Sequence, residues 1–427
     1  MNVYDIAKQV KADSFVLATL SLETRNKALN NIAESLMAHK DEIIKANELD
    51  LVAGEDSGLA DPIMKRLLFD EKKLVDAIGG INDLIEMSDI VGKLLLKREL
   101  DSDLMLRKVT CPIGVIGVIF ESRPDALVQI AALCLKSSNC AILKGGSEAA
   151  NTNRVLFEII HIAGISAGLP EGFLTLLESR SQINEMLGCY EYIDLIIPRG
   201  SNEFVKHIMD NSEIPVMGHS DGICHIYVDK NANIEKAIPV IRDSKVQYVA
   251  ACNATETVLV HKEIAEELLP KVFEELKKYK VEIRGCERTR AIQAEIKPAD
   301  NEDFSTEYLD YIVSIKIVDD IEEAIVHINT YGSHHTDCII TKDDVAAEMF
   351  FIGVDSAGVY RNCSTRFADG YRYGFGAEVG ISTGKLHARG PVGLEGLVTY
   401  KYLVCGNGNI VEDYAEGKKT FKFKDIL

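Results

Sequence analysis

One cysteine in this chain stands where a covalent nucleophile could work. Cys252 lies in VQYVAACNATETVLVH, residues 246–261, after a run of small apolar residues and directly before Asn253 and an apolar, strand-like run. Small neighbours let a substrate reach the thiol, and the backbone N–H of Cys252 and the following Asn253 are candidates to hydrogen-bond an oxyanion. The chain has ten cysteines, however, and a cysteine is often a small buried hydrophobic residue. Local sequence alone leaves both interpretations open.

A lysine beside a glycine-rich turn is the second chemical signal. Lys144 closes the apolar run CAILK, and Gly145, Gly146, Ser147 and a helical pattern follow it. A lysine at the N-terminus of a helix suits a phosphate or a ribose, although an ordinary strand-to-helix turn would have the same sequence. No GxGxxG fingerprint occurs in the right strand–turn–helix context.

The histidines and cysteines do not have the spacing of a metal site. His334 and His335 are adjacent in an expected strand, so their rings should point to opposite faces and chelate one ion poorly. The cysteines are scattered and form no CxxC pair. We therefore predict no metal, and reduced thiols of a cytoplasmic protein rather than a disulfide framework.

Composition narrows the class of protein. The 427 residues include 47% hydrophobic and 26% charged residues, as in a globular protein of two or three domains. The net charge of −19 argues against broad nucleic-acid binding and against adsorption to acidic membranes. We find no basic segment leading into an apolar core at the N-terminus and no apolar run of about 18 residues, so we expect neither a secretory signal nor a membrane span.

The elements that must position these residues follow from periodicity. Apolar residues at three- and four-residue spacing predict helices over 24–47 and 71–87, and residues 92–110 predict a hairpin with its turn at 101–103. Two blocks of alternating strands and helices follow, from 113 to 228 and from 234 to about 360. Short apolar strands separated by helices predict parallel sheets covered on both faces. A late strand, 397–405, should pair with the hairpin or with another subunit, because such an edge is rarely left bare.

Eight segments, taken in chain order, carry a resemblance to one enzyme family. They are PIGVIGVIFESRPDA (112–126), LKGGSEA (143–149), PRGSNEFV (198–205), VMGHSDGICHIYVD (216–229), CNATET (252–257), STEYLD (305–310), STRFADG (364–370) and GAEVGISTGKLHARGPVGLEGL (376–397). This ordered set resembles the γ-glutamyl phosphate reductases, a family of the aldehyde dehydrogenase superfamily.

The resemblance implies an α/β fold of three parts. A Rossmann-type NADPH-binding domain would take residues 1–92 and 111–228, an α/β catalytic domain with the nucleophile 229–385, and a small β oligomerisation flap 93–110 and 395–412. It implies the NADPH-dependent reduction of L-glutamyl 5-phosphate to L-glutamate 5-semialdehyde and phosphate, the second step of proline biosynthesis from glutamate.

The resemblance also assigns roles to residues. Catalysis would fall to Cys252 and Asn253. Cofactor binding would fall to Lys144 and Ser147 at the adenosine ribose and its 2′-phosphate, Gly200 and Ser201 at a further helix start, and Glu307 at the nicotinamide ribose. Substrate binding would fall to Ser122, Arg123, His219, Arg366, Lys385, His387 and Arg389. The turn after Lys144 is one residue shorter than in oxidising relatives, so the contacts of Ser147 and Glu148 could be exchanged. For each basic residue, a surface ion pair is the alternative.

One departure from the wider superfamily favours a reductase. Oxidising members carry a glutamate that activates water to hydrolyse a thioester, and this chain has Val216 and Met217 in the comparable stretch. Without that base, a thioester would not be lost to water.

Two alternatives remain at this point. The chain could be another semialdehyde dehydrogenase of the same superfamily, which phosphate-dependent turnover in the oxidative direction would exclude. It could also be a non-catalytic protein that keeps the fold, although Cys252, Lys144 and Glu307 are all present. As partners we expect a small-molecule substrate, a second copy of the chain and, because acyl phosphates are labile, transient contact with the glutamate 5-kinase that makes the substrate.

Overall fold

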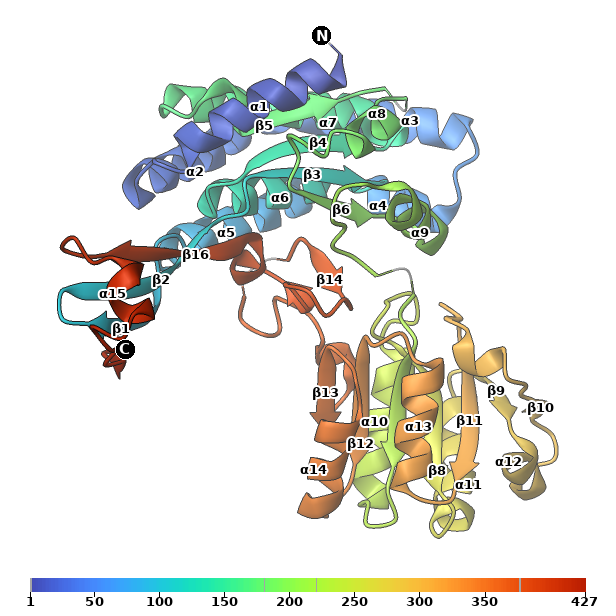
Figure 1. Cartoon of the computed structure of the whole chain (residues 1–427). Helices are drawn as coiled ribbons and strands as arrows, with labels where there is room; N and C mark the ends of the chain where they lie inside the picture. The colour runs from blue at the N-terminus through green and yellow to red at the C-terminus, as the bar shows by residue number, and fades with distance from the viewer. Residues whose placement is uncertain (1, 180, 220, 376–377) are drawn as a thin grey trace. The chain divides into compact units, whose positions relative to one another are not determined.

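The computed structural model describes residues 2–179, 181–219, 221–375 and 378–427 (Figure 1). The chain divides into two compact units. The first comprises residues 1–217, 375–380 and 392–427, and the second comprises residues 218–374 and 381–391. Each is described by itself.

The first unit is built on a parallel sheet of four strands in the order β5-β4-β3-β6. The strands are β3 (Val115–Phe120), β4 (Cys140–Gly145), β5 (Leu174–Leu177) and β6 (Leu195–Arg199). Strands β3 and β4 are buried throughout. The chain steps outward from β3 to β5 and then returns to the other side of β3, so the strand order reverses between β3 and β6. The carboxyl ends of strands at such a reversal are where open α/β sheets bind ligands.

Helices cover both faces of this sheet. They are α1 (Val3–Leu17), α2 (Leu22–Ala38), α3 (Lys40–Asp56), α4 (Asp61–Leu67), α5 (Glu71–Glu86), α6 (Pro124–Lys136), α7 (Ala150–Ser166), α8 (Gln182–Leu187) and α9 (Asn202–Asn211). Helices α6 and α7 pack together on one face, whereas α1 packs on the other with α8. The single helix expected over 24–47 is in fact two, α2 and α3, which meet at His39.

An antiparallel sheet in the order β16-β2-β1-β17 completes the first unit. Its strands are β1 (Leu94–Asp101), β2 (Leu104–Pro112), β16 (Val398–Cys405) and β17 (Lys424–Asp425), and a short helix α15 (Val411–Ala415) precedes β17. Strand β16 pairs with β2 from Val398 opposite Pro112 to Cys405 opposite Met105. The predicted hairpin and the late strand therefore pair with each other within the chain.

The second unit contains a parallel sheet of seven strands in the order β10-β9-β11-β8-β7-β12-β13. The strands are β7 (Cys224–Val228), β8 (Thr255–His261), β9 (Glu282–Gly285), β10 (Lys297–Pro298), β11 (Ile312–Val318), β12 (Thr336–Ile340) and β13 (Gly358–Arg361). The helices are α10 (Ile234–Val246), α11 (Ala265–Lys277), α12 (Glu287–Ile292), α13 (Ile321–Tyr331) and α14 (Asp344–Gly353).

Alternation along the central strands separates two hydrophobic cores. Ile226 and Val228 of β7 pack with α10 and α11, whereas Tyr227 between them packs with α13 and α14. Both faces are therefore buried, as expected for a parallel sheet that helices cover on both sides.

The division of the chain differs from the expected one in three places: residues 375–380 group with the first unit, the expected flap is part of that unit, and strand β7 belongs to the second unit. We expected residues up to 228 to belong to the cofactor domain, but β7 is hydrogen-bonded between β8 and β12 in the second sheet, and the second unit begins at Gly218. The apolar run 223–228 had no local feature to show which sheet it would join.

Two further strands, β14 (Gly380–Ser382) and β15 (Gly390–Val392), form a separate two-stranded sheet. Among the described residues, no helix combines the length and the apolar character needed to cross a membrane.

Candidate active site

The predicted nucleophile lies in a turn between α10 and β8. Cys252 is half-buried, and its backbone packs against Gly222 on the approach to the neighbouring strand β7. A Cβ at position 222 would lie 2.1 Å from the carbonyl oxygen of Cys252 and 2.5 Å from its Cα. Only a glycine allows this approach, so the MGHSDG motif supplies space for the nucleophile turn.

Hydrogen bonds from the STRFADG segment hold the same turn. The side chain of Asn253 is buried and donates through Nδ2 to the carbonyl oxygen of Ala368 at 2.8 Å. The hydroxyl of Thr365 donates to the carbonyl oxygen of Asn253 at 2.7 Å and lies 3.1 Å from the hydroxyl of Thr255. The side-chain amide of Asn253 is thus committed to this segment, and its candidate oxyanion donor is the backbone N–H.

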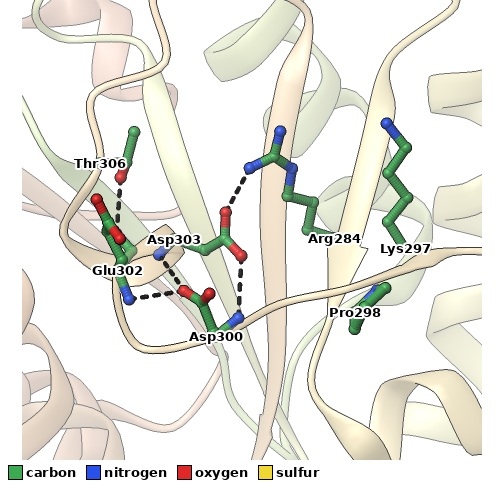
Figure 2. A pocket seen from close by; sticks show the side chains of 7 residues that line it. All are labelled: Arg284, Lys297, Pro298, Asp300, Glu302, Asp303 and Thr306. Carbon is green, nitrogen blue, oxygen red and sulfur yellow. Dashed lines mark hydrogen bonds and ion pairs between the residues drawn. The ribbon is translucent and has the colours of Figure 1, made fainter.

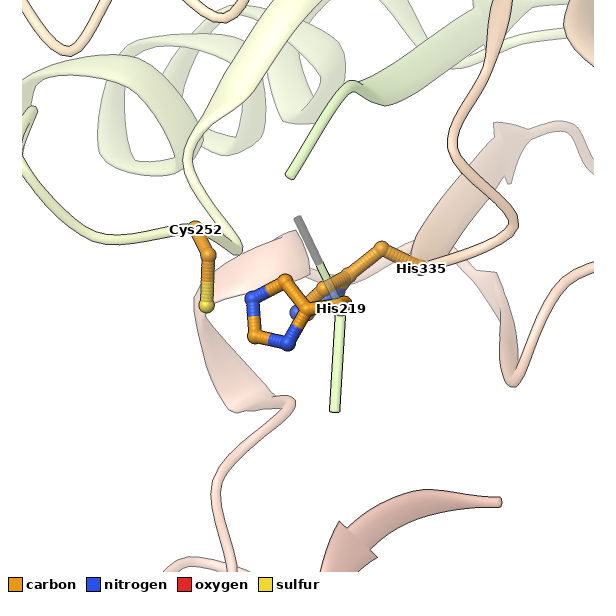
Figure 3. Close-up of side chains that lie close together, drawn as sticks. All are labelled: His219, Cys252 and His335. Carbon is orange, nitrogen blue, oxygen red and sulfur yellow. The ribbon is translucent and has the colours of Figure 1, made fainter. Parts of the chain in front are cut away.

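Two histidines lie beside the Cys252 sulfur, and one of them was not anticipated. Figure 3 shows His219 and His335 next to the thiol. One ligand atom from each of the three residues lies within 4.8 Å of the others. Cys252 and His335 each precede the amino end of a strand, β8 and β12, and these strands flank β7. The order of the strands therefore brings together residues that are far apart in the sequence.

The environment keeps His335 neutral. Its side chain is 1% exposed, and burial lowers its pKa well below the ordinary value, with a further decrease from His219. Its Nδ1 lies 3.0 Å from the hydroxyl of Thr336, and its Nε2 is buried without a hydrogen-bond partner. The Nδ1 of His219 lies 2.9 Å from the carbonyl oxygen of Ile381. A carbonyl only accepts, so this nitrogen carries the hydrogen and, in the neutral ring, Nε2 carries a lone pair.

A buried ion pair flanks the nucleophile turn and was also missed. Lys245 at the end of α10 donates to Glu256 of β8 at 2.5 Å, and both side chains are fully buried. Burial raises the pKa of Glu256 to about 8, against the opposing effect of Lys245, and lowers the pKa of Lys245. Glu307, the expected ribose ligand, is close enough to act electrostatically on both.

The loop that carries Glu307 is anchored by a charged network around a cavity of about 420 Å³ (Figure 2). The cavity is lined by Arg284, Lys297, Pro298, Asp300, Glu302, Asp303 and Thr306. Arg284 binds Asp303 at 2.5 Å and Glu282 at 2.9 Å, and Lys297 binds Glu282 at 2.5 Å. The guanidinium also lies over the ring of Tyr308 at 5.1 Å. Because these charges neutralise one another, the network serves to fix residues 300–308.

The basic residues of the second unit that we expected to bind the substrate fall into two groups. Arg366 is 9% exposed, donates to Gln247 at 3.0 Å and is close enough to Cys252 to act on it electrostatically. Lys385 and Arg389 instead both form ion pairs with the carboxylate of Asp355, at 2.7 and 3.1 Å. For these two residues the structure matches the alternative that a basic residue serves in an ion pair. His387 is exposed.

The expected cofactor residues of the first unit gather at the carboxyl ends of its strands. Lys144 is buried at the end of β4 and donates to the carbonyl oxygen of Gly145. Ser147 begins a 3₁₀ turn, Ser147–Ala149, and the following Glu148 accepts from the N–H and hydroxyl of Ser122 at 2.5 and 2.6 Å. Ser122 is therefore bound to a carboxylate.

The turn after β6 is closed by another carboxylate. A Cβ at Gly200 would lie 2.5 Å from Oε2 of Glu121, and the N–H of Ser201 donates to that oxygen at 3.0 Å. Arg123 lies close by in the sequence and pairs with Asp125 at 3.1 Å. A buried lysine, hydroxyl groups and tight glycine turns at the point where the strand order reverses form a donor set that suits a phosphorylated dinucleotide.

Comparison with known proteins identifies the family. The model of the aldehyde dehydrogenase family matches residues 2–298. A γ-glutamyl phosphate reductase of Acetivibrio thermocellus is 60% identical over 99% of this chain and 98% of its own length. One from Ruminiclostridium cellulolyticum is 58% identical over the same shares. The chain belongs to the γ-glutamyl phosphate reductase family. The crystal structure of a member from Thermotoga maritima superimposes with a TM-score of 0.94 at 40% identity, covering 96% of this chain and 100% of that one.

The missing water-activating glutamate agrees with membership of a reductase family. In this structure Met217 is buried and its N–H donates to the carbonyl oxygen of Ile196 at 2.9 Å. The stretch at Val216 and Met217 thus continues the parallel pairing with β6 and presents apolar side chains.

Proposed function

We propose that this chain reduces L-glutamyl 5-phosphate to L-glutamate 5-semialdehyde and phosphate with NADPH, through a thioester on Cys252. Membership of the γ-glutamyl phosphate reductase family supports the reaction and the use of a nicotinamide cofactor. The observation that carries the mechanism is the half-buried Cys252, in a turn that packs against Gly222 and is held by Thr365, with two imidazoles beside the thiol.

Each chemical step uses a group of the chain. A ring nitrogen of His219 takes the proton of Cys252, and the thiolate attacks the acyl carbon. The C–S bond forms, the bond from that carbon to the phosphate oxygen breaks, and phosphate leaves with its electron pair. NADPH, when bound, supplies the hydride that reduces the thioester. The resulting oxyanion, stabilised by backbone N–H groups of the turn, re-forms the carbonyl as the C–S bond breaks, and the released thiolate takes back the proton that His219 holds.

The cofactor proposal divides the residues by unit. In the first unit Lys144 and Ser147 would hold the adenosine ribose and its 2′-phosphate, which favours NADPH over NADH, with Gly200 and Ser201 at the second turn. In the second unit Glu307 would hold the nicotinamide ribose, on a loop fixed by Arg284. The first unit would thus be the cofactor domain and the second the catalytic domain.

The antiparallel sheet supports an oligomer. Strand β16 is an edge strand, and Tyr400, Tyr402 and Val404 on it are about half exposed. We propose that this sheet is the oligomerisation flap, since a long edge with such side chains is rarely left bare. Tyr402→Lys together with Val404→Lys should shift the oligomer to monomer in analytical ultracentrifugation; an unchanged mass would remove the flap from the interface.

We also propose a cytoplasmic enzyme and a transient complex with the kinase that forms its labile substrate. The complex is tested by rapid mixing of the two enzymes. If transfer through free solution accounts for all of the flux, the complex is unnecessary.

The first test of the function is phosphate-dependent reduction of NADP by glutamate 5-semialdehyde. Native protein should be active, and Cys252→Ala should lose activity below detection while Cys286→Ala, a matched change of another half-buried cysteine, keeps it. Activity that survives in Cys252→Ala would remove the covalent mechanism. A folded native protein that turns over a different semialdehyde would remove the substrate.

A further inference from the structure

The Cys252 thiol and the two imidazoles beside it form a donor set in which the proposed reduction gives His335 no role. The ligand atoms of His219, Cys252 and His335 lie within 4.8 Å of one another and come from three separate segments. Among the described residues, this is the one group of three histidine, cysteine or acidic side chains in such an arrangement. It includes one of the two adjacent histidines; the other, His334, turns away to the carbonyl oxygen of Asp355.

The chemistry of the donors selects a class of cation. One sulfur and two imidazole nitrogens suit borderline-soft ions such as Zn²⁺, which binds thiolate at about 2.3 Å and imidazole at about 2.0–2.1 Å. Mg²⁺ and Ca²⁺ prefer oxygen ligands and would gain little here. Tetrahedral bonds of this length place ligand atoms about 3.5 Å apart, so donors that lie within 4.8 Å of one another need to approach by at most about 1.3 Å.

Two observations indicate that the donors are prepared for a ligand. The Nε2 of His335 has no hydrogen-bond partner, and the His335 side chain is only 1% exposed, so water does not satisfy this nitrogen either. An imidazole in this state loses hydrogen-bonding energy unless a ligand engages it. His219, in addition, is oriented by the carbonyl oxygen of Ile381 at its Nδ1. A carbonyl on the second ring nitrogen is the usual support of a metal-binding histidine.

We propose that His219, Cys252 and His335 form a reversible binding site for Zn²⁺ and similar soft divalent cations. The ion replaces the thiol proton, which passes to the buffer, and no electrons are transferred. A fourth position stays open for water, as in three-ligand zinc sites. The bound ion covers the sulfur, so the loaded protein is a blocked form. Binding does not depend on the proposed reaction; only the inhibition rests on Cys252 as the nucleophile.

The test measures binding and thiol protection separately from activity. Titration of the full-length protein with Zn²⁺ should give one site per chain, and Zn²⁺ should slow alkylation of Cys252 by iodoacetamide until EDTA is added. With Co²⁺ as probe, a thiolate charge-transfer band should appear. Cys252→Ser should abolish that band and weaken Zn²⁺ binding by more than about 100-fold, because even supporting residues contribute about 10–100-fold.

Matched variants decide whether these histidines are the ligands. His335→Gln should weaken binding and remove protection, whereas His161→Gln on α7 and Cys286→Ala should not. If His335→Gln fails to fold because the site is buried, His219→Gln gives the same test at a less buried position. Zn²⁺ binding that is absent, or equal in native protein and the ligand variants, overturns the site. Binding and protection in a protein without reductase activity would uphold the site and remove the proposed function.

Discussion

Adding a single methyl group at Gly222 should move Cys252, the proposed nucleophile. The Cβ of Gly222→Ala would lie 2.1 Å from the carbonyl oxygen of Cys252 and 2.5 Å from its Cα, whereas ordinary contacts lie at about 3.5 Å. Both obstacles are backbone atoms, so no side-chain rotation relieves them, and the turn must shift by about 1 Å. A displacement of this size at a reacting centre costs about 100-fold in rate, or about 2.7 kcal/mol of transition-state stabilisation.

The assay compares kcat for phosphate-dependent NADP reduction with the rate of Cys252 alkylation. Overpacking should also lower the free energy of unfolding by about 1–3 kcal/mol, so the rates are measured well below the melting temperature. Gly79→Ala is the control: a Cβ there meets nothing within 4 Å, and alanine favours a helix interior. A cooperatively folded Gly222→Ala with kcat within about threefold of native would refute the claim that this approach positions the thiol.

Three further changes follow from the same contacts. Thr365→Val should lower the free energy of unfolding by about 1–3 kcal/mol and reduce kcat, because it leaves the buried carbonyl of Asn253 without its donor; urea unfolding and initial rates measure this. Burial lowers the pKa of His327 to about 2, so the folded state binds fewer protons than the unfolded state below about pH 6.5. Stability should therefore be lost as pH falls below that value, by up to about 1.4 kcal/mol per pH unit, and His327→Phe should show a shallower loss in thermal melts. Arg284→Gln should raise the KM for NADPH by about three- to tenfold with little change in kcat, because the loop holding Glu307 loses its anchor.

Each of these has a matched control and a contradicting result. Thr330→Val removes an exposed hydroxyl of α13 and should change little; equal effects of the two threonine changes would remove the role of Thr365. His161→Phe should keep the native pH dependence, and a parallel slope in His327→Phe would show that this histidine does not carry it. Lys297→Gln removes the outer cation of the same network; a KM change as large as that of Arg284→Gln would point to general loosening.

Periodicity was enough to predict most elements because the pattern is local. The runs that became β8, β11 and β12 each contain a cluster of apolar residues and are buried along most of their length, and the hairpin carries its own turn. The break at His39 was not predictable, since residues 38–40 contain neither glycine nor proline. Strand β7 was placed in the wrong sheet for a related reason: pairing partners are set by contacts between distant residues, and the strand itself does not encode them.

The candidate site shows even more clearly that contacts between distant residues cannot be predicted from local sequence. Cys252 was singled out as a candidate from its small neighbours and from the family resemblance, but His335 was set aside because it is adjacent to His334 in the sequence. It reaches the thiol because β12, β7 and β8 are neighbours in one parallel sheet, which aligns their amino ends. The pair Lys245 and Glu256 lacked any motif, and the packing of α10 against β8 brings the two charges together.

The two parallel sheets place their candidate functional residues at opposite ends of their strands. The rule that open α/β sheets bind ligands at the carboxyl ends of the strands therefore applies only to the first unit. In the first unit, Lys144 and the turns at Ser122 and Gly200 follow the carboxyl ends of parallel strands, where open α/β sheets bind ligands. In the second unit, Cys252 and His335 precede the amino ends of theirs. A search of the carboxyl edge of the second sheet would therefore miss the proposed nucleophile. At this edge the parallel strands align the turns that precede them. The reactivity of the site then depends on the residues of those turns: Gly222, which leaves room, the thiol of Cys252, and the imidazole of His335, which burial keeps neutral.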